Sequence, residues 1–219
     1  MSKQLKLRAV RDYCLVTYPE PKPLNLDEDN VASQYKDPDD WTIHRKRAWV
    51  TLLSGAHYDM IDFSIINYCE TGTPQSQRHI RSWMKYLSEY IHSIDLVNAR
   101  PNLEILRSQP EFSLPAVMAV PGQDYTIYLA DERELDDPGA GSPISGEILL
   151  DLPEETFEMA CYSPVTGLYS PWVSLQGKTE THLNVPEFCG DIAIRIRRSG
   201  QAGSTRGMQR CEQIMLHSL

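Results

Sequence analysis

The sequence predicts an α/β region followed by an all-β region. Two observations support this prediction. Between about residues 24 and 66, short apolar runs alternate with a helical segment in the order strand, loop, helix, strand. From about Pro101 the helical period disappears, and alternating or β-branched runs are separated by turn residues. The two halves of the chain therefore use different secondary structure.

Three helices are expected in the N-terminal half. The first covers residues 5–18 and ends at the proline cluster of residues 19–23. The second begins near Asp40, whose carboxylate is placed to cap the first turn, and ends at Gly55, with one face exposed to solvent. The third covers residues 74–94 and has apolar side chains at i, i+3, i+4 and i+7 spacing.

Two short strands flank the second of these helices. Leu24 and Leu26 predict a brief strand that ends at Asn30, and residues 56–66 predict a buried strand that leads into a functional loop. Strand, helix, strand is the repeat of an α/β barrel, in which reactive groups gather where strands end. We therefore expect residues 1–100 to form an incomplete (β/α) barrel of two βα units.

The C-terminal half contains six runs with strand character. They are residues 116–120, 125–129, 147–152, 157–162, 179–185 and 192–196. Six or seven strands at this spacing predict an antiparallel β-sandwich over residues 101–198. The acidic loop at residues 131–145 is expected to be solvated, and the Gly/Ser-rich residues 199–219 are expected to form a flexible tail.

The amino-acid composition limits the kinds of molecule that the chain is expected to bind. The 219 residues include 21 Lys and Arg against 30 Asp and Glu, a formal charge of -9, which argues against nucleic acid or an anionic membrane. The five cysteines are widely spaced, without a CxxC or zinc pattern, and are expected to be reduced thiols. No metal or cofactor motif is present. Without a signal or spanning segment, the expected location is cytoplasmic by default.

The acidic end of the first predicted strand is the strongest candidate for chemistry. Hydrolysis of a glycosidic bond ordinarily needs two carboxyl groups, and Glu28 is the best single candidate for one of them. Asp27 and Asp29 on either side would raise its pKa unless donors such as Asn30 or His44 offset them. The alternative, a solvated acidic turn, has equal support from composition.

The second predicted strand supplies further sugar-binding candidates. His57 and Asp59 are two residues apart, so in an extended strand they share one face and Tyr58 takes the other. His57 and Asp59 could orient a sugar hydroxyl, Tyr58 could stack on a ring, and Asp62 lies in the following loop. The alternative for His57, a buried imidazole bonded to a backbone carbonyl, is favoured about two to one. Trp49 is expected in the core.

Several short stretches resemble one family. The residues are 47–49 and 52–58 in the first half, and 128–129, 162–167 and 191–194 in the second. The first-half stretches are similar to the last βα unit of glycoside hydrolase-like (β/α)8 barrel proteins, and the second-half stretches are similar to the C-terminal β domain, labelled collagen-binding, that such proteins carry. The resemblance implies that the chain is the C-terminal part of such a protein.

The resemblance also assigns roles. The nucleophile or base of such barrels follows the seventh strand, which maps onto Glu28, whereas the general acid follows a fourth strand that this chain lacks. Asp27, Asn30, His57, Tyr58, Asp59 and Asp62 would line the sugar site. Little hydrolysis is expected from the chain alone, and a separately encoded N-terminal barrel chain or a homo-oligomer would complete it. The alternative function is a non-catalytic carbohydrate- or protein-binding module carried by the β-sandwich.

Overall fold

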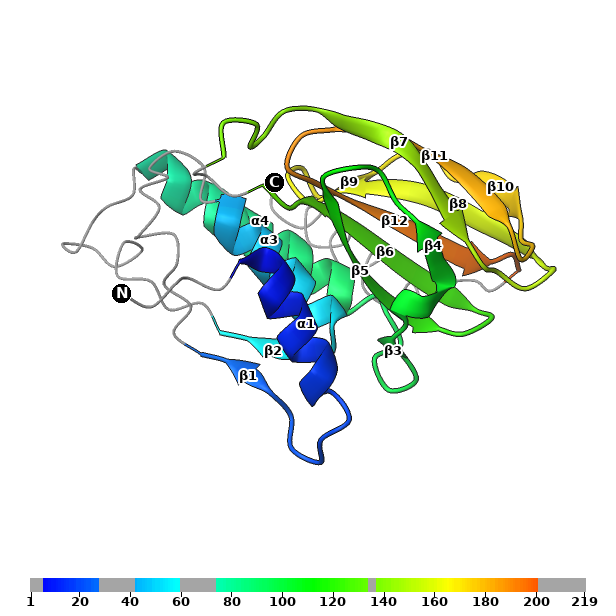
Figure 1. Ribbon diagram of the computed structural model, residues 1–219, viewed down its shortest axis with the longest axis horizontal. Coiled ribbons are helices and arrows are strands. Elements are labelled where there is room, and N and C mark those ends of the chain that lie inside the picture. The colour runs from blue at the N-terminus through cyan, green and yellow to red at the C-terminus, as the bar shows by residue number, and fades with distance from the viewer. Residues whose placement is uncertain (1–5, 28–41, 60–73, 134–136, 201–219) are drawn as a thin grey trace, which may run out of the picture.

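The structure, a computed structural model, describes residues 6–27, 42–59, 74–133 and 137–200. The architecture has three layers, in which a large sheet lies between helices and a small sheet (Figure 1). The mixture is α/β with mostly antiparallel pairing, which confirms the predicted fold class at that level. None of the described helices is both long and apolar enough to span a membrane.

The helices and the parallel strands belong to the N-terminal half. They are α1 (Leu7–Thr17), β1 (Asn25–Leu26), α3 (Thr42–Leu53), β2 (His57–Tyr58) and α4 (Pro74–Ile91). All three expected helices are present. Helix α4 begins with proline at its first position, where the missing N–H costs nothing, and ends three residues earlier than its apolar spacing suggested.

The antiparallel strands form two sheets. The large sheet has the order β10-β8-β12-β6-β5-β3 with β9 also paired to β8, and the small sheet has the order β11-β7-β4. The bounds are β3 (Arg100–Pro101), β4 (Leu106–Ser108), β5 (Ser113–Val120), β6 (Asp124–Asp131), β7 (Ile144–Leu150), β8 (Thr156–Ser163), β9 (Leu168–Tyr169), β10 (Val173–Gln176), β11 (Thr181–Phe188) and β12 (Asp191–Arg198). A short 3-10 turn, Leu103–Ile105, precedes β4.

All six predicted C-terminal runs form strands, namely β5, β6, β7, β8, β11 and β12. The sequence did not predict β3, β4, β9 and β10, because strands of two to four residues are too short to display an alternating pattern. Successive residues of the long strands face opposite layers. In β5, Ala116 and Met118 face the helices, whereas Val117 and Ala119 face the small sheet.

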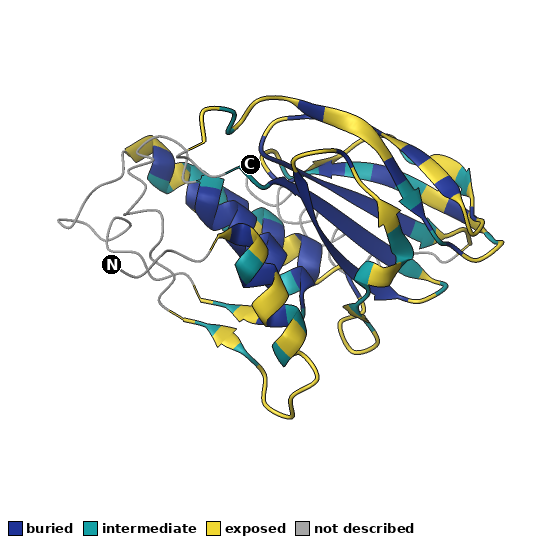
Figure 2. Ribbon diagram, in the orientation of Figure 1, coloured by how far each residue is buried: buried dark blue, intermediate teal, exposed yellow. Residues whose placement is uncertain are grey.

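Two apolar cores result from this alternation. The helix-side core contains Trp49, Leu87 and Tyr90 together with residues of β5, β6, β8 and β12. The inter-sheet core joins both sheets around Ile148, Phe157 and Ile194. Buried residues accordingly concentrate in α3 and in the central strands of the large sheet (Figure 2).

The prediction of an exposed face on α3 was wrong. All of its residues are buried except Thr42 and Leu52, and the buried set includes His44, Arg45, Lys46 and Arg47. The reason is its position, because α3 contacts α1, α4 and the large sheet at once. The helix ends at Leu53, and Gly55 lies in the turn that follows, where the sequence predicted the stop. A β-carbon there would lie 2.3 Å from the Tyr18 ring, and its φ of +85° favours glycine.

Candidate functional site

Strands β1 and β2 pair in parallel, with Asn25 opposite His57 and Leu26 opposite Tyr58. The backbone N–H of His57 donates to the Leu24 carbonyl over 2.9 Å, and that of Asp59 donates to the Leu26 carbonyl over 3.0 Å. Both strands therefore end at the same level. The sequence predicted this strand, helix, strand unit, and the structure contains it with α3 as the helix.

The two faces of this strand pair differ in polarity. Four polar residues are exposed, and we call them the polar edge: Asn25, Asp27, His57 and Asp59. The intervening residues Leu24, Leu26 and Tyr58 are partly buried against the neighbouring helices. The predicted alternation along β2 is therefore present. Because His57 is exposed, the interpretation of it as a buried histidine was wrong.

Tyr58 is oriented by α3. Its hydroxyl lies 3.0 Å from Nδ1 of His44, whose side chain is fully buried. The tyrosine ring consequently packs toward the helix-side core. The sequence suggested His44 as a donor for the acidic strand end, whereas in the structure its Nδ1 faces the Tyr58 hydroxyl.

The structure brings together three of the predicted site residues at the strand ends, Asp27, His57 and Asp59. Tyr58, the fourth described candidate, packs against the helix-side core, and Glu28, Asn30 and Asp62 lie outside the described residues. Within the described part of the chain, no group of His, Cys, Asp and Glu side chains is arranged to hold a metal ion.

A buried ion pair fixes α3, and thereby β2, to the large sheet. The Arg45 guanidinium donates from Nε to Asp191 Oδ2 over 2.9 Å and from Nη2 to Oδ1 over 2.7 Å. The Tyr128 hydroxyl donates to the same carboxylate over 2.7 Å. Arg45 also stacks 4.2 Å above the Trp83 ring. The sequence did not predict this cluster, because Asp191 lies 146 residues from Arg45 along the chain.

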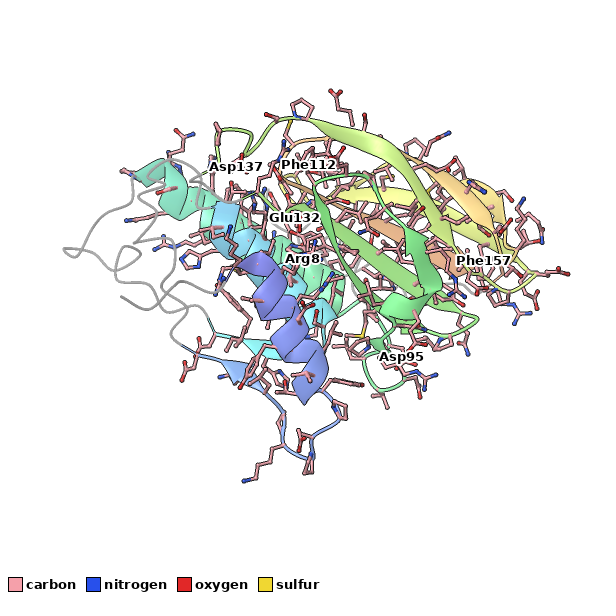
Figure 3. All side chains as sticks on the ribbon, viewed as in Figure 1. Arg8, Asp95, Phe112, Glu132, Asp137 and Phe157 are labelled. Carbon is pink, nitrogen blue, oxygen red and sulfur yellow. The ribbon has the colours of Figure 1, made fainter. Side chains whose placement is uncertain are left out.

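A second polar contact joins α3 to the end of β6. Lys46 donates from Nζ to the Asp131 carbonyl over 2.8 Å. The Asp131 carboxylate accepts from Arg133 Nε over 2.8 Å and from the Gly141 N–H over 2.8 Å. The prediction that this acidic loop is solvated was therefore wrong at Asp131, which is buried. Beside it, Arg8 of α1 pairs with Glu132 (Figure 3).

Aromatic rings fill the space beneath α3. Trp49 is fully buried, as predicted, and stacks on Tyr128 with ring centroids 5.1 Å apart. Tyr90 and Tyr162 contact the same indole at 4.8 Å and 5.9 Å. Burial raises the pKa of all three tyrosines above the ordinary value of 10. These phenols therefore stay neutral and act as packing and hydrogen-bonding groups rather than as acids or bases.

A cavity of about 360 Å³ lies beside β8 and β9 of the large sheet. Its lining comes from β8, β9 and the turn from β11 to β12, and includes Ser163, Leu168, Ser170, Glu187 and Cys189. The cavity is distant in sequence from the polar edge. The described cysteines, Cys14, Cys161 and Cys189, form no disulfide, in agreement with the prediction of reduced thiols.

The fold resembles part of known glycoside hydrolases. No protein-family model matches the sequence, and no curated protein matches it. The structure is similar to a glycoside hydrolase family 5 protein from Bacteroides vulgatus ATCC 8482, with a TM-score of 0.64 and 12% identity over 92% of this chain and 46% of that chain. A second structure, described as a glycoside hydrolase, gives a TM-score of 0.53 and 10% identity over 73% of this chain and 37% of that chain.

These comparisons concern the fold. At 10% and 12% identity they carry no information on which residues react. The chain spans less than half the length of either glycoside hydrolase structure.

Proposed function

We propose that the chain is the C-terminal part of a glycoside hydrolase-like protein. Residues 1–100 would supply the last βα units of a (β/α) barrel, and residues 101–198 would form the β-sandwich that follows it. The observation that carries this proposal is the parallel pairing of β1 and β2 across α3, which ends both strands at one polar edge. The likeness in fold to part of two glycoside hydrolase structures supports it.

The polar edge is the proposed sugar site. The carboxylates of Asp27 and Asp59 accept hydrogen bonds from sugar hydroxyls, and the His57 imidazole can donate or accept. Reactive groups of α/β barrels gather at the carboxyl ends of strands, which is where these residues lie. Glu28 follows Asp27 directly in sequence, and we assign it the role of nucleophile or base.

The general acid has to come from elsewhere. Two carboxyl groups about 5 to 9 Å apart on opposite sides of the glycosidic bond are needed. The described residues before β3 contain only the strands β1 and β2, whose ends lie side by side at the polar edge, and the general acid of such barrels follows an earlier strand. We therefore propose that a separately encoded barrel chain or another subunit supplies the acid, and that the chain alone hydrolyses glycosides little or not at all.

Calorimetric titration with neutral cello-, xylo- and manno-oligosaccharides tests the site. Asp59→Asn and His57→Ala should each weaken binding at least about tenfold, because each removes a charge-assisted or direct hydrogen bond to a hydroxyl. His182→Ala is the matched control, since His182 is also exposed but lies on β11. Binding that is unchanged in both polar-edge variants, or clear hydrolysis by the native chain alone that persists in Glu28→Gln, would contradict the proposal.

A second candidate function has its own observation. The cavity of about 360 Å³ beside β8 and β9 combines hydroxyl, carboxylate and apolar side chains, the usual composition of a small-ligand site. It would suit a non-catalytic binding module carried by the β-sandwich. Glu187→Gln would then weaken oligosaccharide binding, whereas the polar-edge variants would not.

A further inference from the structure

The outer edges of the two sheets differ in how they are protected. Strand β3 has two residues, one of them Pro101. Strand β4 is short and interrupted, and its Arg107 pairs with Asp151. Strand β11 is irregular between Val185 and Phe188, where Pro186 and Glu187 stand. Short length, charge, proline and bulges are the devices by which proteins prevent edge strands from pairing with other chains.

Strand β10 has no charge, proline or bulge. Its four residues, Val173–Gln176, pair in a regular register with β8, and the whole segment 167–176 is uncharged. Among the described residues, no strand pairs with its outer side. Exposed apolar side chains occur along this edge, with Leu168 of β9 at 68% and Val173 of β10 at 51% exposure. Among the described outer edges of the large and small sheets, β10 is the edge whose chemistry favours addition of a strand.

The edge is already ordered. The Trp172 ring lies 3.9 Å below the Arg197 guanidinium and 5.4 Å from the Tyr169 ring. The Ser170 hydroxyl accepts a hydrogen bond of 3.0 Å from the Cys161 N–H, which fixes the kink between β9 and β10. A partner strand would therefore meet a preformed template, and little conformational entropy would be lost on this side of the contact.

We propose that β10 pairs antiparallel with β10 of a second copy of this chain. In an antiparallel strand pair with two-fold symmetry, one residue lies on the axis, directly opposite the same residue of the other copy. Residues that lie directly opposite each other point to the same face of the sheet. With Ser174 on the axis, Val173 lies opposite Leu175 of the other copy, and the reverse pair also forms. A register centred on Val173 would place Leu175 opposite Pro171, and one centred on Leu175 would place Val173 opposite Gly177.

The Ser174-centred register also matches the two faces of the sheet. Leu175 packs against the inter-sheet core, so the two Val–Leu pairs would extend that core across the axis. On the other face Trp172 would lie beside Gln176 of the second copy. The chain carries a formal charge of -9, which makes most contacts between copies repulsive, whereas this uncharged segment brings no like charges together.

Sedimentation equilibrium of the full chain over a range of concentrations tests the proposal. The native chain should form dimers reversibly. Ser174→Lys and Ser174→Asp place like charges opposite each other and should each raise the dissociation constant about tenfold or more, which corresponds to ~1.4 kcal/mol. An equimolar mixture of the two variants should restore dimers, because opposite charges then meet. His182→Lys, on the exposed edge of β11, should leave dimerisation unchanged.

Three results would overturn the proposal. They are a native chain that stays monomeric throughout, Ser174 variants with an unchanged dissociation constant, and variants that weaken the dimer but are not rescued by mixing. Circular dichroism of each variant verifies that it is folded. The outcome is independent of the proposed sugar site, because Ser174 lies on β10 and the polar edge on β1 and β2.

Discussion

The two faces of the large sheet are stabilised in different ways. The inter-sheet core consists of aliphatic side chains together with the aromatic residues Tyr125, Phe157 and Phe188. The helix-side core combines stacked aromatic rings with buried ionic groups, above all the pair of Arg45 and Asp191. The first core depends on an alternating pattern in which hydrophobic residues of similar volume can replace one another. The second depends on individual polar contacts.

This difference matters for the candidate site. Only Ser54, Gly55 and Ala56 separate α3 from β2, so the position of α3 on the sheet determines where the polar edge lies. The contacts of Arg45 and Lys46 fix that position. We therefore expect changes in the helix-side core to affect the site, and changes in the inter-sheet core to affect mainly overall stability.

Asp191→Ala should have the largest effect. It leaves the buried Arg45 guanidinium without its carboxylate and removes the acceptor of the Tyr128 hydroxyl, at a cost of about 3–5 kcal/mol in the free energy of unfolding. Urea unfolding measures this. Asp151→Ala, which breaks the exposed pair with Arg107, is the control and should cost no more than about 1 kcal/mol.

A double variant sharpens that test. Replacing Arg45 by Met together with Asp191 by Leu removes both charges, so it should cost clearly less than Asp191→Ala alone. Equal losses in Asp191→Ala and Asp151→Ala would contradict the importance of the buried pair.

Alkaline pH should weaken mainly the helix-side core. Burial raises the pKa of Tyr90, Tyr128 and Tyr162 in the folded chain. Above pH 10 the unfolded chain therefore loses protons that the folded chain keeps, and stability falls as pH rises. Below pH 10 these groups have no effect. Each such tyrosine contributes a slope of up to about 1.4 kcal/mol per pH unit.

Urea unfolding at a series of pH values from neutral to strongly alkaline measures this slope. Tyr162→Phe should reduce it, whereas Tyr125→Phe tests the one tyrosine of the inter-sheet core, whose pKa burial also raises. If the fall in unfolding free energy with pH persists in full in Tyr162→Phe and disappears in Tyr125→Phe, the inter-sheet core and not the helix-side core determines the loss of stability at alkaline pH.

Ile148→Val should have a modest effect. Ile148 is fully buried between the sheets, and loss of one methylene costs about 0.5–1.5 kcal/mol. Oligosaccharide binding at the polar edge should be unchanged, because Ile148 lies on β7. A loss of binding in Ile148→Val comparable to that in Asp59→Asn would contradict the separation of the two cores.

The smallest perturbation is chemical labelling of thiols. Cys14 lies on the buried face of α1, and burial raises its pKa to about 11, whereas Cys189 is exposed. Peptide mapping after brief alkylation at neutral pH should find Cys189 modified and Cys14 intact. Early modification of Cys14 would mean that α1 detaches readily from the strand pair.

The elements that the sequence predicted share one property. Helix α4 and the six long strands have apolar residues at regular spacing, so local pattern and final burial agree. Helix α3 differs, because Arg45 and Lys46 read as a solvent-exposed face and are buried by partners more than 80 residues away. A charge buried by distant partners leaves no local signature.

In the candidate site, too, some contacts could be predicted from the sequence and others could not. The proximity of Asp27 and Asp59 could be predicted, since consecutive parallel strands end at one edge. The contact of His44 with Tyr58 could not, because it depends on how α3 rotates against the strand pair. The free edge at β10 was missed because a strand of four residues shows no period.

Amide chemical-shift mapping during titration with a neutral oligosaccharide tests whether the polar edge binds sugar. We expect the shifts to concentrate at Asn25, Asp27, His57 and Asp59, and Asp59→Asn to diminish them. Shifts confined to the cavity beside β8 and β9, around Leu168, Ser170 and Glu187, would contradict it and would place ligand binding in the β-sheet region.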